Sequence, residues 1–354
     1  MIDPHVHLRD WGQAHKETLR HGLSVAYRAG LDGVFEMPNT DPPLTARETI
    51  LRRIDDADRA MRVAGVSLFH GLYAGITADP RQIEEAVRAR SDLFPRVVGL
   101  KMFAGHSTGN MGIVARADQE RVYRTLASLG YAGLLAVHCE KESLLRPDAW
   151  DPSRPSSHAR ARPPAAEVAS VDDQIALARA AGFRGTLHVC HLSTPWALDL
   201  LRRTHAPPDP APGFPVTCGL TPHHALLDAS MMDSPRGALL KVNPPLRPKP
   251  MPALLLKRLA AGAIDWIETD HAPHALTEKS GAGAASGIPV LPFYPAFVKL
   301  LLDRGMPRPL IEELTHEGIC RAFGLAVPKS GRPPDYRLAG EYPFDPFAVS
   351  GAAR

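Results

Sequence analysis

Long apolar runs, charge runs and a recognisable leader segment are all missing from this sequence of 354 residues. No apolar stretch reaches about 18 residues, the length that a membrane-spanning helix needs. The opening MIDPHVHLRD has no basic segment followed by an apolar one, so we expect no signal peptide. The 41 basic and 38 acidic residues give a net charge of +3 with no long run of one sign. We therefore expect neither a nucleic-acid partner nor a membrane partner.

Cysteine is scarce as well. The four cysteines, Cys139, Cys190, Cys218 and Cys320, form no CxxC pair, so neither a zinc finger nor a disulfide scaffold is supported. A reducing, cytoplasmic location is therefore expected. Proline is in excess, with 35 copies, whereas its usual share is about 5%. Apolar residues at 44% and charged residues at 22% are typical of a soluble globular protein.

Short apolar runs alternate with helix-like segments along most of the chain. Continuous apolar strands that alternate with amphipathic helices are typical of a parallel sheet covered on both faces. Helical patterns include residues 16–29, 46–64 and 167–181. Eight apolar runs lie at residues 2–8, 33–37, 67–73, 97–103, 133–139, 186–192, 215–220 and 263–269.

Eight strand–helix units in about 270 residues predict a closed (β/α)8 TIM barrel. An open doubly wound sheet is the alternative, but no GxGxxG motif follows the first run. We expect residues 1–325 to form the barrel. Residues 326–354 are rich in proline and glycine, and we expect this tail to pack on the barrel.

Polar residues collect where the apolar runs end. In a barrel the active site lies at the C-terminal ends of the strands. A single polar residue there is often structural, but eight that converge on one rim favour a functional site. The eight are His5, His7, Asn39, Lys101, His138, His191, His223 and Asp270.

Three of these residues have patterns that suggest metal chemistry. His5 and His7 are two positions apart on a strand, so both imidazoles face one side and can bind one metal ion. Taken alone, the pair also fits two solvent-facing histidines. Lys101 lies in an otherwise apolar run, where a charged amine is costly. Either the neutral amine reacts with carbon dioxide to give a carbamate that bridges two metals, or the side chain reaches solvent from the strand end.

The later runs add further candidate ligands. His138 ends the fifth run, and the sixth offers His188 and His191, which should face opposite sides of a strand. We choose His191 because it is nearer the C-terminal end, and we expect His188 to be structural. Asp270 could bind a metal and accept a proton from its water, or simply cap a helix. Nitrogen and oxygen donors without a thiolate suit zinc, with manganese or cobalt as substitutes.

The ordered motifs identify a family. The chain resembles the dihydroorotases of the cyclic amidohydrolase superfamily over about residues 1–325. Members of that family interconvert N-carbamoyl-L-aspartate and L-dihydroorotate in pyrimidine biosynthesis. The motifs are DPHVHLRD (3–10), EMPNTDPP (36–43), GLKMF (99–103), AVHCE (136–140), HVCHLST (188–194), TPHH (221–224), VNPPLR (242–247) and TDHAPH (269–274).

The resemblance implies a role for each matched residue. It implies two Zn²⁺ ions, one held by His5, His7 and Asp270 and the other by His138 and His191. N6-carboxylated Lys101 and a hydroxide would bridge the ions, and Asp270 would carry the proton of the reversible cyclisation. Substrate would be bound by Arg9, Asn39, Asn243, His274 and the backbone at Gly287. His223 and His224 would lie at the rim of the site.

The resemblance leaves alternatives open. Because the HxH motif begins at residue 5, we expect this chain to be without the N-terminal half of the accessory β-sandwich that many relatives have. A hydantoinase or allantoinase would share the metals but not the Arg9 clamp, and a catalytically silent barrel could bind another pyrimidine enzyme. We also expect residues 104–112 to form either a lid or a plain connection, with Ser107 and Thr108 as donors to substrate. The partner is expected to be a small-molecule substrate, and a homodimer is left open.

Overall fold

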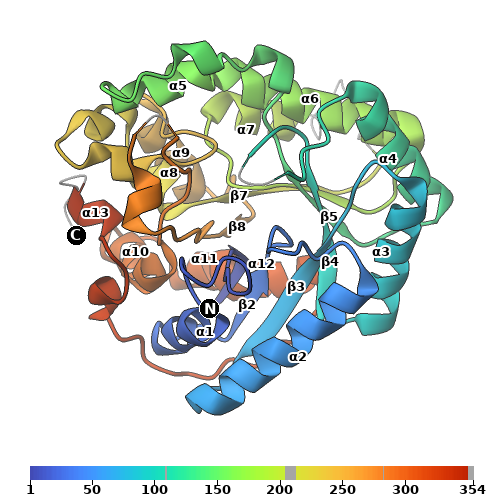
Figure 1. The fold of residues 1–354 in the computed structure, drawn as a ribbon, viewed down its shortest axis with the longest axis horizontal. Helices are drawn as coiled ribbons and strands as arrows, with labels where there is room; N and C mark the ends of the chain where they lie inside the picture. Colours follow the sequence, from blue (N-terminus) through green and yellow to red (C-terminus); the bar gives the residue numbers. More distant parts are fainter. Residues whose placement is uncertain (108–109, 204–212, 282, 350–354) are drawn as a thin grey trace.

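Eight parallel strands follow one another around one sheet in the order of the sequence, with the helices outside them (Figure 1). This computed structural model describes residues 1–107, 110–203, 213–281 and 283–349. The prediction of a (β/α)8 TIM barrel is confirmed, with the barrel nearly closed. The strands are β1 (Ile2–Val6), β2 (Gly33–Glu36), β3 (Phe69–Gly75), β4 (Val97–Phe103), β5 (Leu134–His138), β6 (Thr186–Val189), β7 (Val216–Leu220) and β8 (Trp266–Ile267).

Helices connect the strands and cover the barrel. Within the described residues, no helix is long and apolar enough to cross a membrane. The helices are α1 (Leu19–Arg28), α2 (Arg47–Ala64), α3 (Pro80–Leu93), α4 (Arg116–Ser128), α5 (His158–Ala161), α6 (Pro164–Ala181), α7 (Pro195–Arg203), α8 (Pro222–Leu226), α9 (Met251–Ala260), α10 (Tyr294–Asp303), α11 (Arg308–Glu312), α12 (Gly318–Phe323) and α13 (Pro346–Val349).

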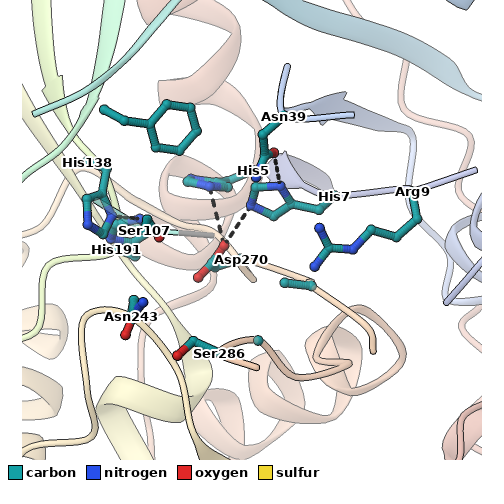
Figure 2. A pocket seen from close by; sticks show the side chains of 13 residues that line it. His5, His7, Arg9, Asn39, Ser107, His138, His191, Asn243, Asp270 and Ser286 are labelled. Atoms are coloured by element: carbon teal, nitrogen blue, oxygen red, sulfur yellow. Dashed lines mark hydrogen bonds and ion pairs between the residues drawn. The ribbon is translucent and has the colours of Figure 1, made fainter. Parts of the chain in front are cut away.

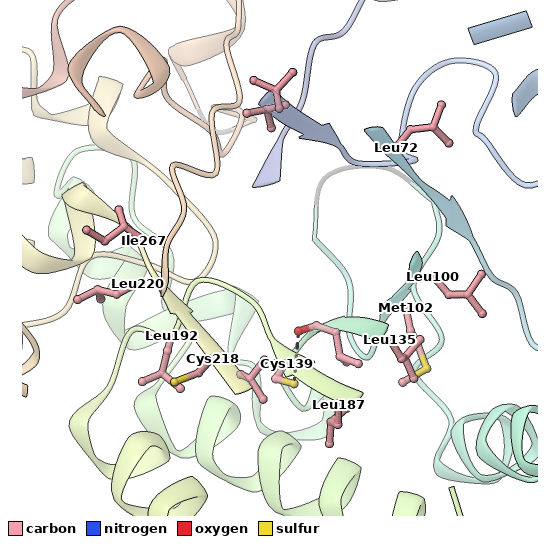
Figure 3. Packing of buried hydrophobic residues seen from close by; sticks show 14 of the residues in the cluster. Leu72, Leu100, Met102, Leu135, Cys139, Leu187, Leu192, Cys218, Leu220 and Ile267 are labelled. Carbon is pink, nitrogen blue, oxygen red and sulfur yellow. Dashed lines mark hydrogen bonds between the residues drawn. The ribbon is translucent and has the colours of Figure 1, made fainter. Parts of the chain in front are cut away.

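The strands are apolar on both faces because each face packs against a different layer. Outward side chains such as Leu100, Leu135 and Leu187 belong to the large cluster between the strands and the helices (Figure 3). Inward side chains such as Phe35 form a second cluster with Phe323 of α12, whose ring lies 4.9 Å from that of Phe35. The interior is therefore a filled core, and the open C-terminal rim is left for the site.

Side chains complete the seam between the first and last strands. β8 is short, and its continuation meets β1 through a bridge between Val6 and His271, with His7 N donating to His271 O at 2.7 Å. The Asp3 carboxyl accepts from Thr269 N at 3.0 Å and from Thr269 Oγ1 at 2.5 Å. Burial raises the pKa of Asp3 to about 7. This seam brings the histidines of β1 beside the residues that follow β8.

The C-terminal segment lies beside α1 (Figure 1). Arg332 donates to Tyr27 O at 2.9 Å and to Leu31 O at 2.8 Å. The Tyr342 hydroxyl is buried and donates to Glu17 Oε1 at 2.5 Å. The C-terminal segment is thereby held against α1 and its flanking loops, whereas residues 350–354 of the expected tail lie outside the described residues.

Candidate active site

A pocket of about 370 Å³ opens at the C-terminal ends of the strands (Figure 2). Apart from Lys101, His274 and Thr108, the last of which lies outside the described residues, every residue that we predicted to hold metal or substrate lines it. The lining residues are His5, His7, Arg9, Asn39, Phe103, Ser107, His138, His191, Asn243, Asp270, Ala272, Ser286 and Gly287.

Asp270 lies between the two histidines of β1. Its Oδ1 is 3.4 Å from His5 Nε2 and 3.1 Å from His7 Nε2. The other ring nitrogen of His7, Nδ1, lies 2.6 Å from Asn39 Oδ1, which fixes the orientation of the imidazole. Asn39 therefore contacts a candidate metal ligand as well as the pocket.

His138 and His191 form a second pair across the pocket. Their facing atoms, His138 Nδ1 and His191 Nε2, are 3.2 Å apart. His138 Nε2 lies 3.1 Å from Glu140 Oε2, which also accepts from Arg162 Nε at 2.9 Å. His191 has a φ of 37°, and its backbone N–H donates to Glu268. A left-handed non-glycine residue of this kind is often found at functional sites.

Burial keeps the four imidazoles neutral. It lowers the pKa of His5 to about 4, that of His138 below its ordinary value, and those of His7 and His191 well below it. Burial also raises the pKa of the Asp270 carboxyl above its ordinary value. Neutral imidazoles have lone pairs free for a metal, and a carboxyl with a raised pKa is suited to holding a proton.

The donor atoms have the spacing that a metal site needs. Donors of His5, His191 and Asp270 all lie within 4.8 Å of one another. Two ligands of one tetrahedral zinc ion are about 3.3–3.5 Å apart, since each lies at about 2.0–2.1 Å. Among the described residues the buried Nδ1 atoms of His5 and His191 have no hydrogen-bond partner. The donor set therefore fits a divalent metal.

A thiol lies beside this donor set, which the sequence analysis did not anticipate. His5, Cys190 and Glu268 form a second group whose donor atoms are within 4.8 Å of one another. Glu268 also lies 3.2 Å from His188 Nε2, and His188 stacks on the Trp266 ring inside the barrel. His188 thus contacts Glu268 and Trp266 and does not line the pocket, whereas His191 does.

Lys101 is fully buried and does not reach solvent. Its Nζ donates to Cys190 Sγ at 3.0 Å and lies 4.9 Å from the Phe103 ring. No carboxylate in the described part of the chain forms an ion pair with it. The alternative in which this side chain extends to solvent from the strand end is therefore wrong, and a buried ammonium without an anionic partner is costly.

Arg9 and its neighbours form the wall of the pocket that lies across from His138 and His191 (Figure 2). Arg9 Nε donates to Pro273 O at 3.1 Å, and Nη2 lies 3.3 Å from His274 Nε2. Burial lowers the pKa of Arg9 to about 10, which leaves the guanidinium charged at neutral pH. His274 is thus buried behind Arg9 and contacts it directly.

Asn243 and Gly287 line the remaining side. Asn243 Oδ1 lies 2.9 Å from His158 Nε2. Gly287 has a φ of 140°, and a Cβ there would lie 2.5 Å from Ala272 O, so only glycine fits this wall. In the expected lid, Ser107 lines the pocket, whereas Thr108 lies outside the described residues.

The TPHH histidines are buried next to the site. His224 lies 2.9 Å from Thr221 Oγ1 through Nδ1 and 3.0 Å from Pro244 O through Nε2. Neither ring nitrogen of His223 has a hydrogen-bond partner within the described ranges. The structure assigns neither of them to the pocket lining.

Two acidic residues near the site had a sequence signal that could have been used. Glu268 is two positions before Asp270, and Glu140 is two positions after His138. Residues two apart on a strand face the same side, so each glutamate could have been expected on the side of a predicted metal ligand. Gly219 on the neighbouring strand is explained by Glu268, because a Cβ at position 219 would lie only 2.3 Å from the carboxyl carbon of Glu268. Glycine on β7 therefore leaves room for a carboxylate supplied by the next strand.

The chain has relatives among characterised sequences, although no protein-family model matches it. It is 33% identical over 333 residues to the dihydroorotase of Methanothermobacter thermautotrophicus, covering 92% of this chain and 69% of that protein. It is 33% identical over 345 residues to the dihydroorotase of Thermococcus kodakarensis, covering 97% and 71%.

Solved structures share the fold at lower identity. The L-hydantoinase of Arthrobacter aurescens superposes with a TM-score of 0.78 at 22% identity, covering 91% of this chain and 70% of that one. The dihydroorotase of Campylobacter jejuni gives a TM-score of 0.68 at 16% identity, covering 92% and 83%. At these identities the likeness establishes the fold alone, so the sequence relatives decide between the two names.

Proposed function

We propose, from the premise that the chain belongs to the dihydroorotase family, that it catalyses the reversible cyclisation of N-carbamoyl-L-aspartate to L-dihydroorotate. The observation that carries this proposal is the Arg9 guanidinium in the wall of the pocket that contains Asp270. Both compounds bear a carboxylate that is not part of the reacting bond, and a planar guanidinium binds carboxylates in a bidentate manner. A neutral cyclic amide such as hydantoin has no carboxylate for this bidentate, charge-assisted contact.

The metal assignment follows the donor set. His5, His7 and Asp270 would hold one ion, His138 and His191 the other, and Lys101 as a carbamate would bridge them. Forming the carbamate replaces the buried positive charge of Lys101 with a negative one, which removes the cost of an ammonium without an anionic partner. We favour zinc because its sites combine imidazole and carboxylate ligands. When bound, the ions polarise the amide carbonyl and lower the pKa of water.

The residues of the chain bind, orient and move a proton. Arg9, with Asn39 and His274 beside it, holds the substrate carboxylate, and Asn243 and the Gly287 backbone bound the ring. In hydrolysis the Asp270 carboxylate takes the proton of the attacking water and passes it to the leaving ring nitrogen. In ring closure Asp270 starts protonated and the same steps run in reverse. The raised pKa of Asp270 suits this role, because the carboxyl group has to hold a proton for part of the cycle.

The test is turnover by the purified, metal-loaded protein. We expect N-carbamoyl-L-aspartate and L-dihydroorotate to be interconverted, as measured by chromatography, with hydantoin and dihydrouracil turned over far more slowly. Turnover of hydantoin alone would make the chain a hydantoinase. No turnover of any of these compounds by protein with full metal content would favour a binding role. The mass of the peptide that contains Lys101 tests the carbamate.

A further inference from the structure

An unusual turn places Arg9 in the pocket. Arg9, Asp10 and Trp11 have φ angles of 51°, 64° and 50°, so three successive non-glycine residues are left-handed. For residues with a Cβ this region of φ is unfavourable, because the Cβ comes too close to the following carbonyl oxygen. A turn of this kind persists only where surrounding groups hold it.

Arg53 of α2 contacts both ends of the turn. Its side chain is fully buried, and its Nη2 donates to Arg9 O at 2.7 Å. The same guanidinium lies 4.8 Å from the centre of the Trp11 ring. Between these two contacts, the Asp10 carboxylate accepts from Trp11 N at 2.8 Å and from Leu19 N at 2.9 Å.

Arg53 is itself fixed to the barrel. Its Nε donates to the two oxygens of Glu36 at 3.1 and 3.0 Å, and its Nη2 also donates to Glu36. Glu36 is the last residue of β2, and its Oε2 lies 3.0 Å from His70 Nε2 on β3. A buried chain of polar contacts therefore runs from two strands through Arg53 to the carbonyl of Arg9.

We propose that Arg53 is a positioning residue that holds the left-handed turn and thereby sets the guanidinium of Arg9 for the substrate carboxylate. The proposal rests on the proposed function, because it gives the Arg9 clamp a specific support. It requires that Arg53 act through Arg9 and not through the metal ligands, none of which it contacts in the described structure.

Arg53→Lys is the main variant, because it keeps a cation beside Glu36 but lacks the fork that reaches Glu36 and Arg9 O together. A second variant, Arg53→Met combined with Glu36→Gln, removes both buried charges and avoids an orphaned carboxylate. Arg52→Met is the matched control, since Arg52 lies 4.7 Å from the Trp11 ring centre but is exposed and does not bind Arg9 O.

Two measurements test the proposal. Hydrogen exchange at Asp10 and Gly12, whose amides bind Glu17 O and Asp41 O, should be faster in both Arg53 variants and unchanged in Arg52→Met. The KM for N-carbamoyl-L-aspartate should rise about tenfold in Arg53→Lys, with kcat changed by less than about threefold and metal content unchanged. In an Arg9→Met background, Arg53→Lys should produce no further rise in KM.

The outcomes separate this proposal from the proposed function. Unchanged exchange in folded Arg53 variants overturns the support of the turn, whatever the enzyme acts on. Faster exchange with an unchanged KM, or an equal rise in KM without Arg9, overturns the link to the clamp. Absence of turnover by wild-type protein overturns the proposed function alone, and exchange then still decides whether Arg53 holds the turn.

Discussion

Replacing Arg9 with methionine should weaken substrate binding and leave the metal in place. Methionine preserves the length and apolar stem of the side chain but cannot donate hydrogen bonds. Arg9 Nε and one N–H of Nη2 contact Pro273 O and His274 Nε2, which leaves both N–H groups of Nη1 and the second one of Nη2 for a carboxylate. Losing one charged hydrogen bond costs about 1.5–3 kcal/mol, which corresponds to a rise of about 10–150-fold in KM.

Steady-state kinetics in both directions provide the assay, with metal content measured on the same samples. Arg20→Met is a matched control, because Arg20 is exposed on α1. The ratio of kcat/KM for dihydroorotate to that for dihydrouracil, which lacks the carboxylate, should fall by the same factor as the affinity. A parallel loss of metal would give Arg9 a structural role, and an unchanged KM with metal retained would refute the clamp.

Three further perturbations have expected results. Lys101→Ala should lose most bound metal and nearly all turnover, with partial recovery of both in short carboxylic acids; full metal content without them would contradict a bridging role. Hydrolysis should fall as pH drops and ring closure should fall as pH rises, because Asp270 must start as carboxylate in one direction and as acid in the other. Parallel profiles with metal retained, or activity in Asp270→Asn, would remove it from proton transfer. For Glu36, burial alone would raise the pKa, but Arg53 and His70 lower it to about 2. Its contribution to the free energy of unfolding, about 3 kcal/mol, is thus complete above about pH 4.5 and is lost toward pH 2. Urea unfolding should show a shallower dependence over this range in Glu36→Gln, and an identical slope would count against the ion pair.

Strand positions could be predicted where backbone pairing alone defines the strand. The run at 97–103 coincides with β4, whereas the run at 263–269 yields only Trp266–Ile267. At the end of that run, Thr269 binds the side chain of Asp3 instead of a strand backbone. A bond from backbone to a distant carboxylate leaves no periodic pattern in the sequence.

We chose His191 over His188 on the assumption that both lie on one strand, where side chains alternate between the two faces. The strand does not extend as far as His191. β6 ends at Val189, and His191 has a left-handed backbone. Its amide binds Glu268 and not a neighbouring strand, which turns its ring toward His138. The other reason for choosing His191, its position near the C-terminal end of the strand, agrees with its place in the pocket lining.

Burial on helices was the hardest property to predict. The segment 46–64 is rich in arginine and aspartate, and adjacent residues Arg52 and Arg53 look equivalent in it. One is exposed and the other is fully buried, because only Arg53 faces the Glu36 carboxylate at the end of β2. Identifying it required knowing which strand end lies under the helix.

The seam between β1 and β8 determines when this pocket can form during synthesis. Its candidate ligands include His5 and His7 on β1 and Asp270, which is translated more than 260 residues after them. The edge of β1 that receives His271 stays unpaired over that interval, and Tyr342 reaches Glu17 later still. Nascent chains that end before Asp270 therefore lack the His7–Asp270 contact and expose a strand edge, which is a hazard for aggregation. Assembly of the site therefore has to wait for the segment after β8, which packs against a strand made more than 260 residues earlier.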